Sequence, residues 1–411
     1  MAAIPPRWHL EDRLDRALAI AAAEAAREAD ADGTADLAEA DHPRGADAPD
    51  APEPDPAPAR AAFHRLRVAA VERLTADAVA VTFAVPPHLA GAYGFRAGQH
   101  LTIRSDHGGC GVRRSYSIAA PAGGPLRVGI KRLPGGAFSA WAVEDLAPGD
   151  ELEVMTPAGT FCLDPDPSSA RHVVALAVGS GITPVLSVVA TVLAAEPGSQ
   201  VTLLYGNRTT AEVMFAEDLE DLKNRHPARF QVLYVLSREP QEAPLRAGRL
   251  DAAKLGTVLE RLVPAAEVDD WFLCGPQDLV ADWRATLLAA GVEKARVHRE
   301  LFHAGPPLAA AGPAAAPAGP ARTVLFTLDG RSSTVVVGGA EAVLDGVLRL
   351  RADAPYACRG GVCGTCRARL VDGAVEMAEN YALESDELGA GYVLTCQARP
   401  VTDTVTLDYD A

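Results

Sequence analysis

Near the C-terminal end, residues 358–366 read Cys-Arg-Gly-Gly-Val-Cys-Gly-Thr-Cys, and Cys396 follows after 29 intervening residues. A centre with two irons needs four thiolates, two for each metal, and three of them can come from one loop while the fourth comes from a distant segment. The glycines between the cysteines remove side-chain bulk, so backbone N–H groups can approach the sulfur atoms. The segment therefore predicts a 2Fe-2S cluster held by Cys358, Cys363, Cys366 and Cys396.

Zinc is the alternative metal for four cysteines. Structural zinc sites usually pair their ligands as two closely spaced couples, whereas here three cysteines crowd into nine residues, which is the spacing of plant-type ferredoxins. The other cysteines, Cys110, Cys162 and Cys274, stand alone, and seven in 411 residues are too few for a disulfide-linked secreted scaffold. With no secretory pattern at the start of the chain, the cysteine usage predicts a reducing compartment, the cytoplasm.

Upstream of the cysteine loop, residues 305–321 consist of eight Ala, five Pro, three Gly and one Leu. This composition predicts a linker, so residues 322–411 should form a domain that is able to reposition.

Residues 166–304 alternate continuous apolar runs with helical stretches, which predicts an α/β domain with a parallel sheet. The run at 173–178 is followed by a glycine turn containing Gly181 and Thr183, where helix amides could meet an anion. A second turn, Cys274-Gly275-Pro276, follows a later strand. Both turns should lie on the carboxyl edge of the sheet, where nucleotides bind, although each turn alone could simply serve packing.

Two arginines follow other strands of this sheet, Arg208 and the Ser237-Arg238 pair. An arginine with a hydroxyl neighbour suits the 2'-phosphate of NADPH, whereas a ribose hydroxyl is usually bound by a carboxylate. NADPH is therefore favoured. Glu239 keeps NADH possible, and both arginines could instead be solvated surface charges.

Residues 61–165 contain short runs rich in Val, Thr and Phe, such as 79–85, which predict an antiparallel β-barrel. The tetrapeptide Arg114-Ser115-Tyr116-Ser117 near a strand end supplies a cation, an aromatic ring and a hydroxyl, which a flavin needs for its pyrophosphate, its ring and its reactive nitrogen. Alone it is weak, but Gly129-Ile130-Lys131 and the turn from Gly135 to Ser139 offer further amides and a hydroxyl for phosphate. Together these segments favour a flavin.

Residues 1–60 carry 14 acidic and 6 basic side chains, half of the formal net charge of −16. Residues 9–29 favour a helix and residues 43–59 favour disorder, so this part is expected to be an appendage. The negative charge argues against nucleic acid as a partner, and no apolar run approaches the roughly 20 residues of a membrane-spanning helix. Small molecules and proteins remain as the expected partners.

In the order of its modules the chain resembles the ferredoxin-NADP reductase superfamily, in the arrangement with a C-terminal ferredoxin domain, over about residues 62–410. Some stretches are similar, more narrowly, to the reductase subunits of phenylacetyl-CoA epoxidase complexes. These stretches are 95–101, 205–209, 356–358, 380–384 and 391–398. The resemblance implies an FAD-binding barrel, an NAD(P)-binding α/β domain and a β-grasp ferredoxin domain.

The resemblance also implies a role for individual residues. Arg114, Tyr116 and Ser117 would hold FAD, with Ser117 near the nitrogen that accepts hydride, and Ile130, Lys131, Gly136 and Ser139 would complete that site. Gly181 and Thr183 would contact the nucleotides, Cys274 would flank the nicotinamide, and Glu300 would approach the flavin. We take Ser117, Cys274 and Glu300 as the expected catalytic residues.

These cofactors predict an electron-transfer enzyme, because nicotinamide gives electrons in pairs, an iron–sulfur cluster takes them singly, and a flavin does both. By resemblance the acceptor is a di-iron oxygenase, the epoxidase of aerobic phenylacetate breakdown. A reductase for another oxygenase, such as an aromatic-ring hydroxylase, fits the residues equally well. A non-catalytic redox sensor is the alternative from a different class of protein.

Overall fold

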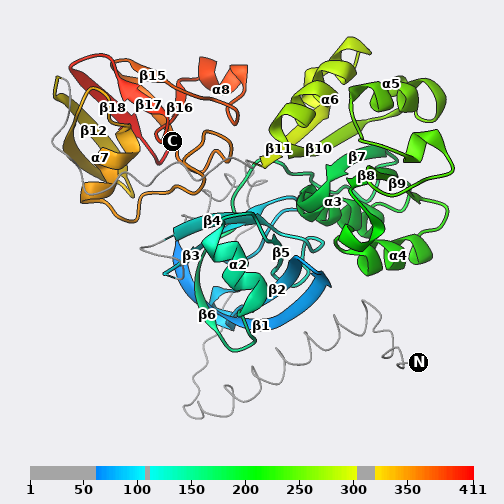
Figure 1. Ribbon diagram of the computed structural model, residues 1–411. Coiled ribbons are helices and arrows are strands. Elements are labelled where there is room, and N and C mark those ends of the chain that lie inside the picture. The colour runs from blue at the N-terminus through cyan, green and yellow to red at the C-terminus, as the bar shows by residue number, and fades with distance from the viewer. Residues whose placement is uncertain (1–61, 107–111, 303–319) are drawn as a thin grey trace, which may run out of the picture.

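The computed structural model describes residues 62–106, 112–302 and 320–411, which form three sheets with their helices (Figure 1). The extension expected over 1–60 and all but the last two residues of the expected linker lie outside these ranges. None of the described helices combines the length and apolar character needed to cross a bilayer.

The first sheet is antiparallel, with six strands in the order β4-β3-β6-β1-β2-β5. Its elements are β1 (Phe63–Thr75), β2 (Ala78–Ala84), β3 (His100–Ser105), β4 (Val112–Ser117), β5 (Arg127–Lys131), β6 (Glu151–Met155) and helix α2 (Ala137–Glu144). A bridge between Ile118 and Val128 joins the end of β4 to β5, the opposite edge of the sheet. This bridge closes the barrel that the sequence predicts. We refer to this part as the barrel domain.

Strand β2 is buried on both faces. Val79, Val81 and Phe83 fill the barrel interior, as their alternation predicts. Ala78 and Ala80, between them, pack into a second core that is shared with the next domain. The sequence pattern could not predict that Ala78 and Ala80 are buried, because alanine is common both inside proteins and on their surfaces.

The second sheet is parallel, with the strand order β11-β10-β7-β8-β9. Its strands are β7 (His172–Val178), β8 (Gln200–Asn207), β9 (Phe230–Leu236), β10 (Asp270–Pro276) and β11 (Val297–Phe302). Its helices are α3 (Ile182–Ala195), α4 (Ala216–Arg225), α5 (Ala252–Arg261) and α6 (Gln277–Ala289). Helix α3 is buried from Ile182 to Leu193, because it lies between the sheet and the barrel, while α5 and α6 cover the other face (Figure 1). We call this part the parallel-sheet domain.

The third part, the C-terminal domain, contains a five-stranded sheet in the order β13-β12-β18-β14-β16 and a small β15-β17 pair. Its elements are β12 (Arg322–Leu328), β13 (Arg331–Val337), α7 (Val343–Leu350), β14 (Arg367–Asp372), β15 (Val375–Met377), α8 (Ser385–Gly389), β16 (Tyr392–Leu394), β17 (Ala398–Pro400) and β18 (Thr404–Asp408). The first and last strands, β12 and β18, pair in parallel, and α7 packs its apolar face on the sheet. This is the predicted β-grasp arrangement.

Candidate active site and cluster-binding loop

The structure brings the three expected catalytic residues together from three strands. Ser117 ends β4 of the barrel domain, and its Oγ donates a hydrogen bond of 2.8 Å to Oε2 of Glu300 on β11. The register of β10 and β11 sets Glu300 directly beside Cys274. Ser117 and Glu300 are 183 positions apart in the chain, so only the contact between the two domains forms this group.

Burial controls the proton chemistry of this group. It raises the pKa of Glu300 to about 7, against the opposing effect of the hydrogen bond from Ser117. Burial and the nearby charge of Glu300 also raise the pKa of the Cys274 thiol. Near neutral pH, Glu300 can therefore both accept and release a proton through Ser117. Cys274 stays a neutral thiol, which suits packing and not nucleophilic attack.

His100, the first residue of β3 and the register partner of Ser117 on β4, also belongs to this group. Its Nδ1 lies 3.7 Å from Oε1 of Glu300, and its Nε2 lies 3.5 Å from Oγ1 of Thr365 in the cysteine loop. Burial lowers the pKa of His100 to about 4, so the ring is neutral. Nothing in the sequence marks His100 as a site residue, because one histidine on a strand carries no signal of its own.

The residues expected to hold a flavin lie at neighbouring strand ends of the barrel. Arg114 is exposed, and Tyr116 is half-buried with its ring centroid 5.8 Å from that of Phe138. The closing bridge places β5 beside the end of β4, with Ile130 buried and Lys131 within 3.5 Å of Asp77. A cation, an aromatic ring and a hydroxyl thus share one region of the surface, and this set fits a flavin.

The turn before α2 differs in one detail from the expectation. Ser139 Oγ accepts from the Leu133 amide and donates to the Gly136 carbonyl, both at 3.1 Å, so the hydroxyl bonds within the turn. A Cβ at Gly136 would lie only 2.6 Å from this oxygen, which is why glycine stands there. Ser139 therefore shapes the turn, and the amides that open α2 remain as donors for a phosphate.

The two glycine turns of the parallel sheet lie on the same edge, as predicted. β7 and β10 are neighbours, with Cys274 beside Ala177. A Cβ on Gly181 would come within 2.4 Å of the Cys274 carbonyl oxygen, so only glycine allows this approach. Thr183, at the start of α3, donates to the Ser180 carbonyl at 3.0 Å. Gly275 is buried and Pro276 is exposed beside this turn.

The residues expected near the adenosine end also lie together. Backbone hydrogen bonds join Ser237 to Asn207 at 3.0 Å and Arg238 to Arg208 at 2.8 Å, so the turns after β8 and β9 are adjacent. Ser237 and Arg238 are exposed, whereas Arg208 forms an ion pair with Glu212.

Glu239, the residue that left NADH open, accepts hydrogen bonds from both the amide and the hydroxyl of Thr210, at 2.7 and 2.9 Å. Both of its carboxylate oxygens are therefore engaged with the protein.

The four cysteines of the predicted cluster form two pairs. The Cys358 thiol interacts with that of Cys363, and the Cys366 thiol with that of Cys396; the first interaction helps to lower the pKa of Cys358 to about 6. The Gly360 amide donates to Cys358 Sγ at 3.3 Å.

Glycines shape the loop around these thiols. Gly361 and Gly364 have φ values of 75° and 66°, the left-handed region that favours glycine. Within the described ranges, no three Cys, His, Asp or Glu side chains converge on a point that could hold one metal ion. Two thiol pairs instead fit a centre with two irons, one pair for each iron.

Comparison with known proteins agrees with all three parts. Residues 65–162 match the oxidoreductase FAD-binding domain, residues 175–285 the oxidoreductase NAD-binding domain, and residues 326–401 the 2Fe-2S iron-sulfur cluster binding domain. The chain is 43% identical to one of the subunits of 1,2-phenylacetyl-CoA epoxidase from Escherichia coli, over 85% of this chain and 98% of that protein. The chain belongs to the reductases of the ferredoxin-NADP reductase type with a C-terminal 2Fe-2S ferredoxin domain.

Other relatives of this reductase have the same architecture. It is 35% identical to the ferredoxin reductase component of 3-ketosteroid-9-alpha-monooxygenase from Rhodococcus rhodochrous, over 84% of this chain and 96% of that one. Phthalate dioxygenase reductase shares the fold at a TM-score of 0.53 and 24% identity, covering 84% of this chain and 98% of that one. The protein is therefore an oxidoreductase with FAD-binding, pyridine-nucleotide-binding and 2Fe-2S domains.

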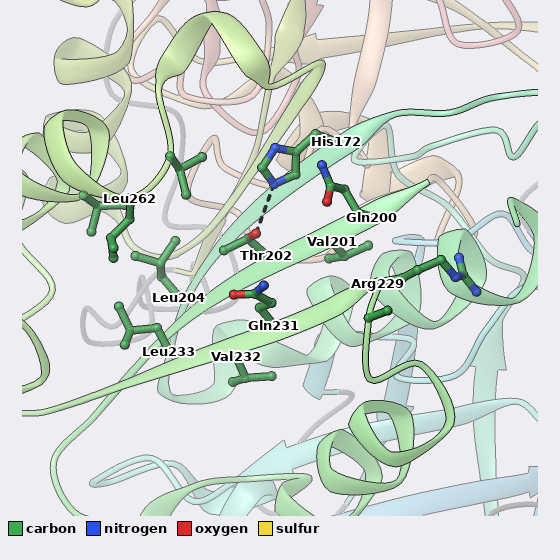
Figure 2. A pocket seen from close by; sticks show the side chains of 13 residues that line it. His172, Gln200, Val201, Thr202, Leu204, Arg229, Gln231, Val232, Leu233 and Leu262 are labelled. Carbon is green, nitrogen blue, oxygen red and sulfur yellow. Dashed lines mark hydrogen bonds between the residues drawn. The ribbon is translucent and has the colours of Figure 1, made fainter. Parts of the chain in front are cut away.

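A pocket of about 330 Å³ in the reductase lies away from this site (Figure 2). Its lining includes His172 and Gln200, which begin β7 and β8, so it opens at the amino ends of the parallel strands. His172 Nε2 lies 3.0 Å from Thr202 Oγ1 there. The turns with Gly181 and Cys274 occupy the opposite edge, so this pocket does not belong to the candidate active site.

Proposed function

We propose that this reductase takes electrons from NADPH and delivers them to the oxygenase component of a multicomponent monooxygenase, specifically a phenylacetyl-CoA epoxidase. The observation that carries this proposal is the 43% identity to a protein of the Escherichia coli epoxidase over 98% of that protein's length. When bound, FAD accepts an electron pair from the nicotinamide and the 2Fe-2S cluster passes electrons on singly. A reductase for a 3-ketosteroid monooxygenase is the second candidate, supported by the 35% identity to such a component.

We propose the following roles for the residues of the site. Arg114, Tyr116, Ile130 and Lys131, with the turn that Gly136 and Ser139 form, hold FAD, and Gly181, Thr183, Gly275 and Pro276 hold the nucleotide. Cys274 flanks the nicotinamide. Ser117 and Glu300 move a proton at the reactive nitrogen of the flavin, which the 2.8 Å hydrogen bond between them and the raised pKa of Glu300 support. Cys358, Cys363, Cys366 and Cys396 ligate the cluster.

NADPH is proposed over NADH on the basis of the adenosine end of the site. Exposed Arg238, with Ser237 beside it, offers a cation and a hydroxyl to a 2'-phosphate. The carboxylate of Glu239, the acceptor that a ribose hydroxyl would need, already accepts two hydrogen bonds from Thr210, about half of its capacity.

We further propose that the flavin-binding, nucleotide-binding and ferredoxin domains span 61–165, 166–304 and 322–411, with 305–321 as a linker. Among the described residues no strand lies between Met155 and His172, which supports the first boundary, and the Ala- and Pro-rich composition of 305–321 supports the linker. The cytoplasm is the proposed location, supported by six free cysteines among the described residues.

Reconstitution tests the function. The purified holoprotein is combined with the oxygenase component of phenylacetyl-CoA epoxidase, or separately with that of 3-ketosteroid-9-alpha-monooxygenase, and product formed is compared with NADPH consumed. We expect tight coupling only with the first. Coupling only with the second would replace the proposed partner. Failure to oxidise NADPH with cytochrome c or ferricyanide would leave the redox sensor as the better interpretation.

A further inference from the structure

Arg113 is the neighbour of the proposed FAD ligand Arg114, but it points to a different part of the molecule. Its side chain is buried, with 5% exposed, between the barrel domain and the C-terminal domain. Nη1 donates to the Ala354 carbonyl at 3.1 Å, and Nη2 donates to the Ala352 carbonyl at 2.8 Å. Both carbonyls belong to the segment that leads into the cysteine loop at Cys358.

Aromatic rings enclose the same guanidinium. The Arg113 Cζ lies 4.1 Å from the ring centroid of Tyr356, in the C-terminal domain, and 4.9 Å from that of Phe63, in the barrel domain. Arg104 Cζ lies 4.7 Å from the Phe63 centroid, and Arg359 Cζ lies 4.7 Å from the Tyr356 centroid. Three arginines and two rings thus form one stack across the boundary between the domains, in which Arg113 contacts both rings. Contacts of this kind are strongest where water is excluded, as at Arg113.

The outer members of this stack are fixed within their own domains. Arg104 donates to both carboxylate oxygens of Glu153 on β6, each at 2.6 Å. Arg359 donates to Asp345 on α7 at 2.7 Å. Arg113 is the member of the stack whose hydrogen bonds cross the boundary.

A second contact lies on the parallel-sheet domain. The Glu384 carboxylate of the C-terminal domain forms ion pairs with Lys294 Nζ and Arg299 Nη2, each at 2.8 Å. It also lies 3.8 Å from Arg284 Nη2. Its side chain is 34% exposed, so these pairs lie in a setting where ion pairs contribute modestly. Val362 and Tyr381 of the C-terminal domain also pack against the core of the parallel-sheet domain. Of the polar attachments, Arg113 is expected to be the stronger.

We propose that Arg113 is a positioning residue that holds the C-terminal domain with its cysteine loop against the flavin site. This inference rests on the proposed function, since the distance between flavin and cluster matters only if electrons pass between them. The flat, forked guanidinium is needed because it bonds two carbonyls through two of its nitrogens while it packs against two aromatic rings. Lysine cannot do both. In this arrangement the cysteine loop reaches the candidate active site, because Thr365 of the loop contacts His100, which lies beside Glu300 and its partner Ser117.

The test compares the Arg113→Ala holoprotein with wild type. NADPH-dependent ferricyanide reduction, which needs only the flavin, should be unchanged. Reduction of the cluster in stopped flow should slow by roughly 10- to 100-fold, the expected result of losing charge-assisted hydrogen bonds that hold the competent arrangement. Hydrogen–deuterium exchange should increase in the peptide covering residues 352–356. Arg113→Lys should give values between those of wild type and Arg113→Ala. Arg65→Ala, which removes an exposed arginine of the same barrel, should match wild type in all three measurements.

Two further variants keep the proposal open to refutation if Arg113→Ala fails to retain its cofactors. Tyr356→Leu removes one face of the stack and Glu384→Gln weakens the second contact, with iron and sulfide content checked in each. Hydrogen–deuterium exchange and the rate of cluster reduction should change strongly in Tyr356→Leu and weakly in Glu384→Gln. Wild-type values for Tyr356→Leu in both measurements would overturn the proposal. Hydrogen–deuterium exchange needs no electron acceptor, so it reports the attachment of the C-terminal domain independently of electron transfer. If wild type is inactive with NADPH while the variants still differ from it in exchange, the proposed function is refuted and the role of Arg113 in attachment is not.

Discussion

The barrel domain contacts its two neighbours in different ways. Against the parallel-sheet domain it forms a shared apolar core, in which Ala78 and Ala80 meet helix α3, and a buried pair of Arg127 and Asp218 at 2.8 Å, with 8% and 6% exposed. Against the C-terminal domain the described contacts centre on the side chain of Arg113. The first interface resembles a domain interior and the second a docking surface. The barrel and parallel-sheet domains, which match the FAD-binding and NAD-binding families, therefore form one fixed unit, and the C-terminal domain, which matches the 2Fe-2S family, attaches to it.

Gly129 shows how closely the first interface is fitted. A Cβ at this position of β5 would lie 2.6 Å from Thr183 Cγ2 and 2.9 Å from Phe215 Cε2. Any other residue would push apart the strand that supports the flavin site and the helix that begins at the nucleotide turn. The second interface shows no such glycine toward the barrel among the described residues.

Replacing Cys363 with Ser gives the largest expected effect, because it should remove the cluster and leave the fixed unit intact. Iron and acid-labile sulfide should fall, and electron delivery to the oxygenase should be abolished, while ferricyanide reduction by NADPH continues. Cys162→Ser, at a half-buried barrel cysteine, is the matched control and should retain both activities. Oxygenase turnover that survives in Cys363→Ser would show that electrons leave by another route.

The two sites also differ in how much the sequence could predict. The cysteine loop was predicted residue by residue, because three ligands and their glycines lie within nine positions and local spacing determines the geometry. The group at Ser117 and Glu300 was reached through family resemblance, because its members come from strands that only tertiary packing brings together. The barrel, the parallel sheet and their order followed from hydrophobic patterns.

The residues between domains were not predicted. Arg113 directly precedes the tetrapeptide that begins at Arg114, and no pattern in the sequence separates a buried interface arginine from an exposed one. Asp218 on α4 looks like one more surface acid of a polar helix, although it is buried against Arg127. Such contacts depend on how domains meet, and hydrophobic periodicity reports only how each domain folds.

Arg127→Met should break the fixed unit. It leaves the Asp218 carboxylate buried without its guanidinium, which is expected to cost about 3–5 kcal/mol of unfolding free energy. Urea unfolding followed by flavin fluorescence measures the loss. Arg132→Ala, which removes an exposed pair with Glu144, should cost only about 0–1 kcal/mol.

Combining Arg127→Met with Asp218→Leu should recover part of the lost stability, because no buried charge of that pair remains. A small loss in Arg127→Met alone would mean that the two domains do not depend on this pair, and the comparison between the interfaces would weaken.

Glu300 lies where the two interfaces meet, and its titration should be visible in the rate. Because burial raises its pKa to about 7, the carboxylate that accepts a proton through Ser117 forms as the pH rises through 7. Cytochrome c reduction should increase over that range in wild type. Glu300→Gln should be roughly 100-fold slower and flat with pH, the usual scale for losing a general base. Glu144→Gln, at an exposed carboxylate, should keep the wild-type profile.

The same pKa shift has a consequence for stability. The stability that the raised pKa of Glu300 contributes is fully present below its ordinary pKa of 4.5 and is lost as the pH rises through about 7. Wild type should therefore lose unfolding free energy relative to Glu300→Gln over this window. His100 cannot produce an inflection near 7, since burial lowers its pKa to about 4. An unchanged pH profile in Glu300→Gln would assign the proton to another group.

Arg238→Ala gives the smallest expected effect, because this side chain is exposed after β9, the edge strand at the far end of the sheet from β11 and Glu300. Losing one charge-assisted contact to a 2'-phosphate should raise KM for NADPH by about 10-fold, the equivalent of ~1.4 kcal/mol. KM for NADH, kcat and stability should not change, since the Ser117–Glu300 hydrogen bond and the buried Arg127–Asp218 pair stay intact. Arg246→Ala, in the same domain, serves as the control for general loss of positive charge. An equal rise in KM for both nucleotides would show that Arg238 binds a part that they share, and the selectivity for NADPH would then have to come from Arg208, although Glu212 already pairs with it.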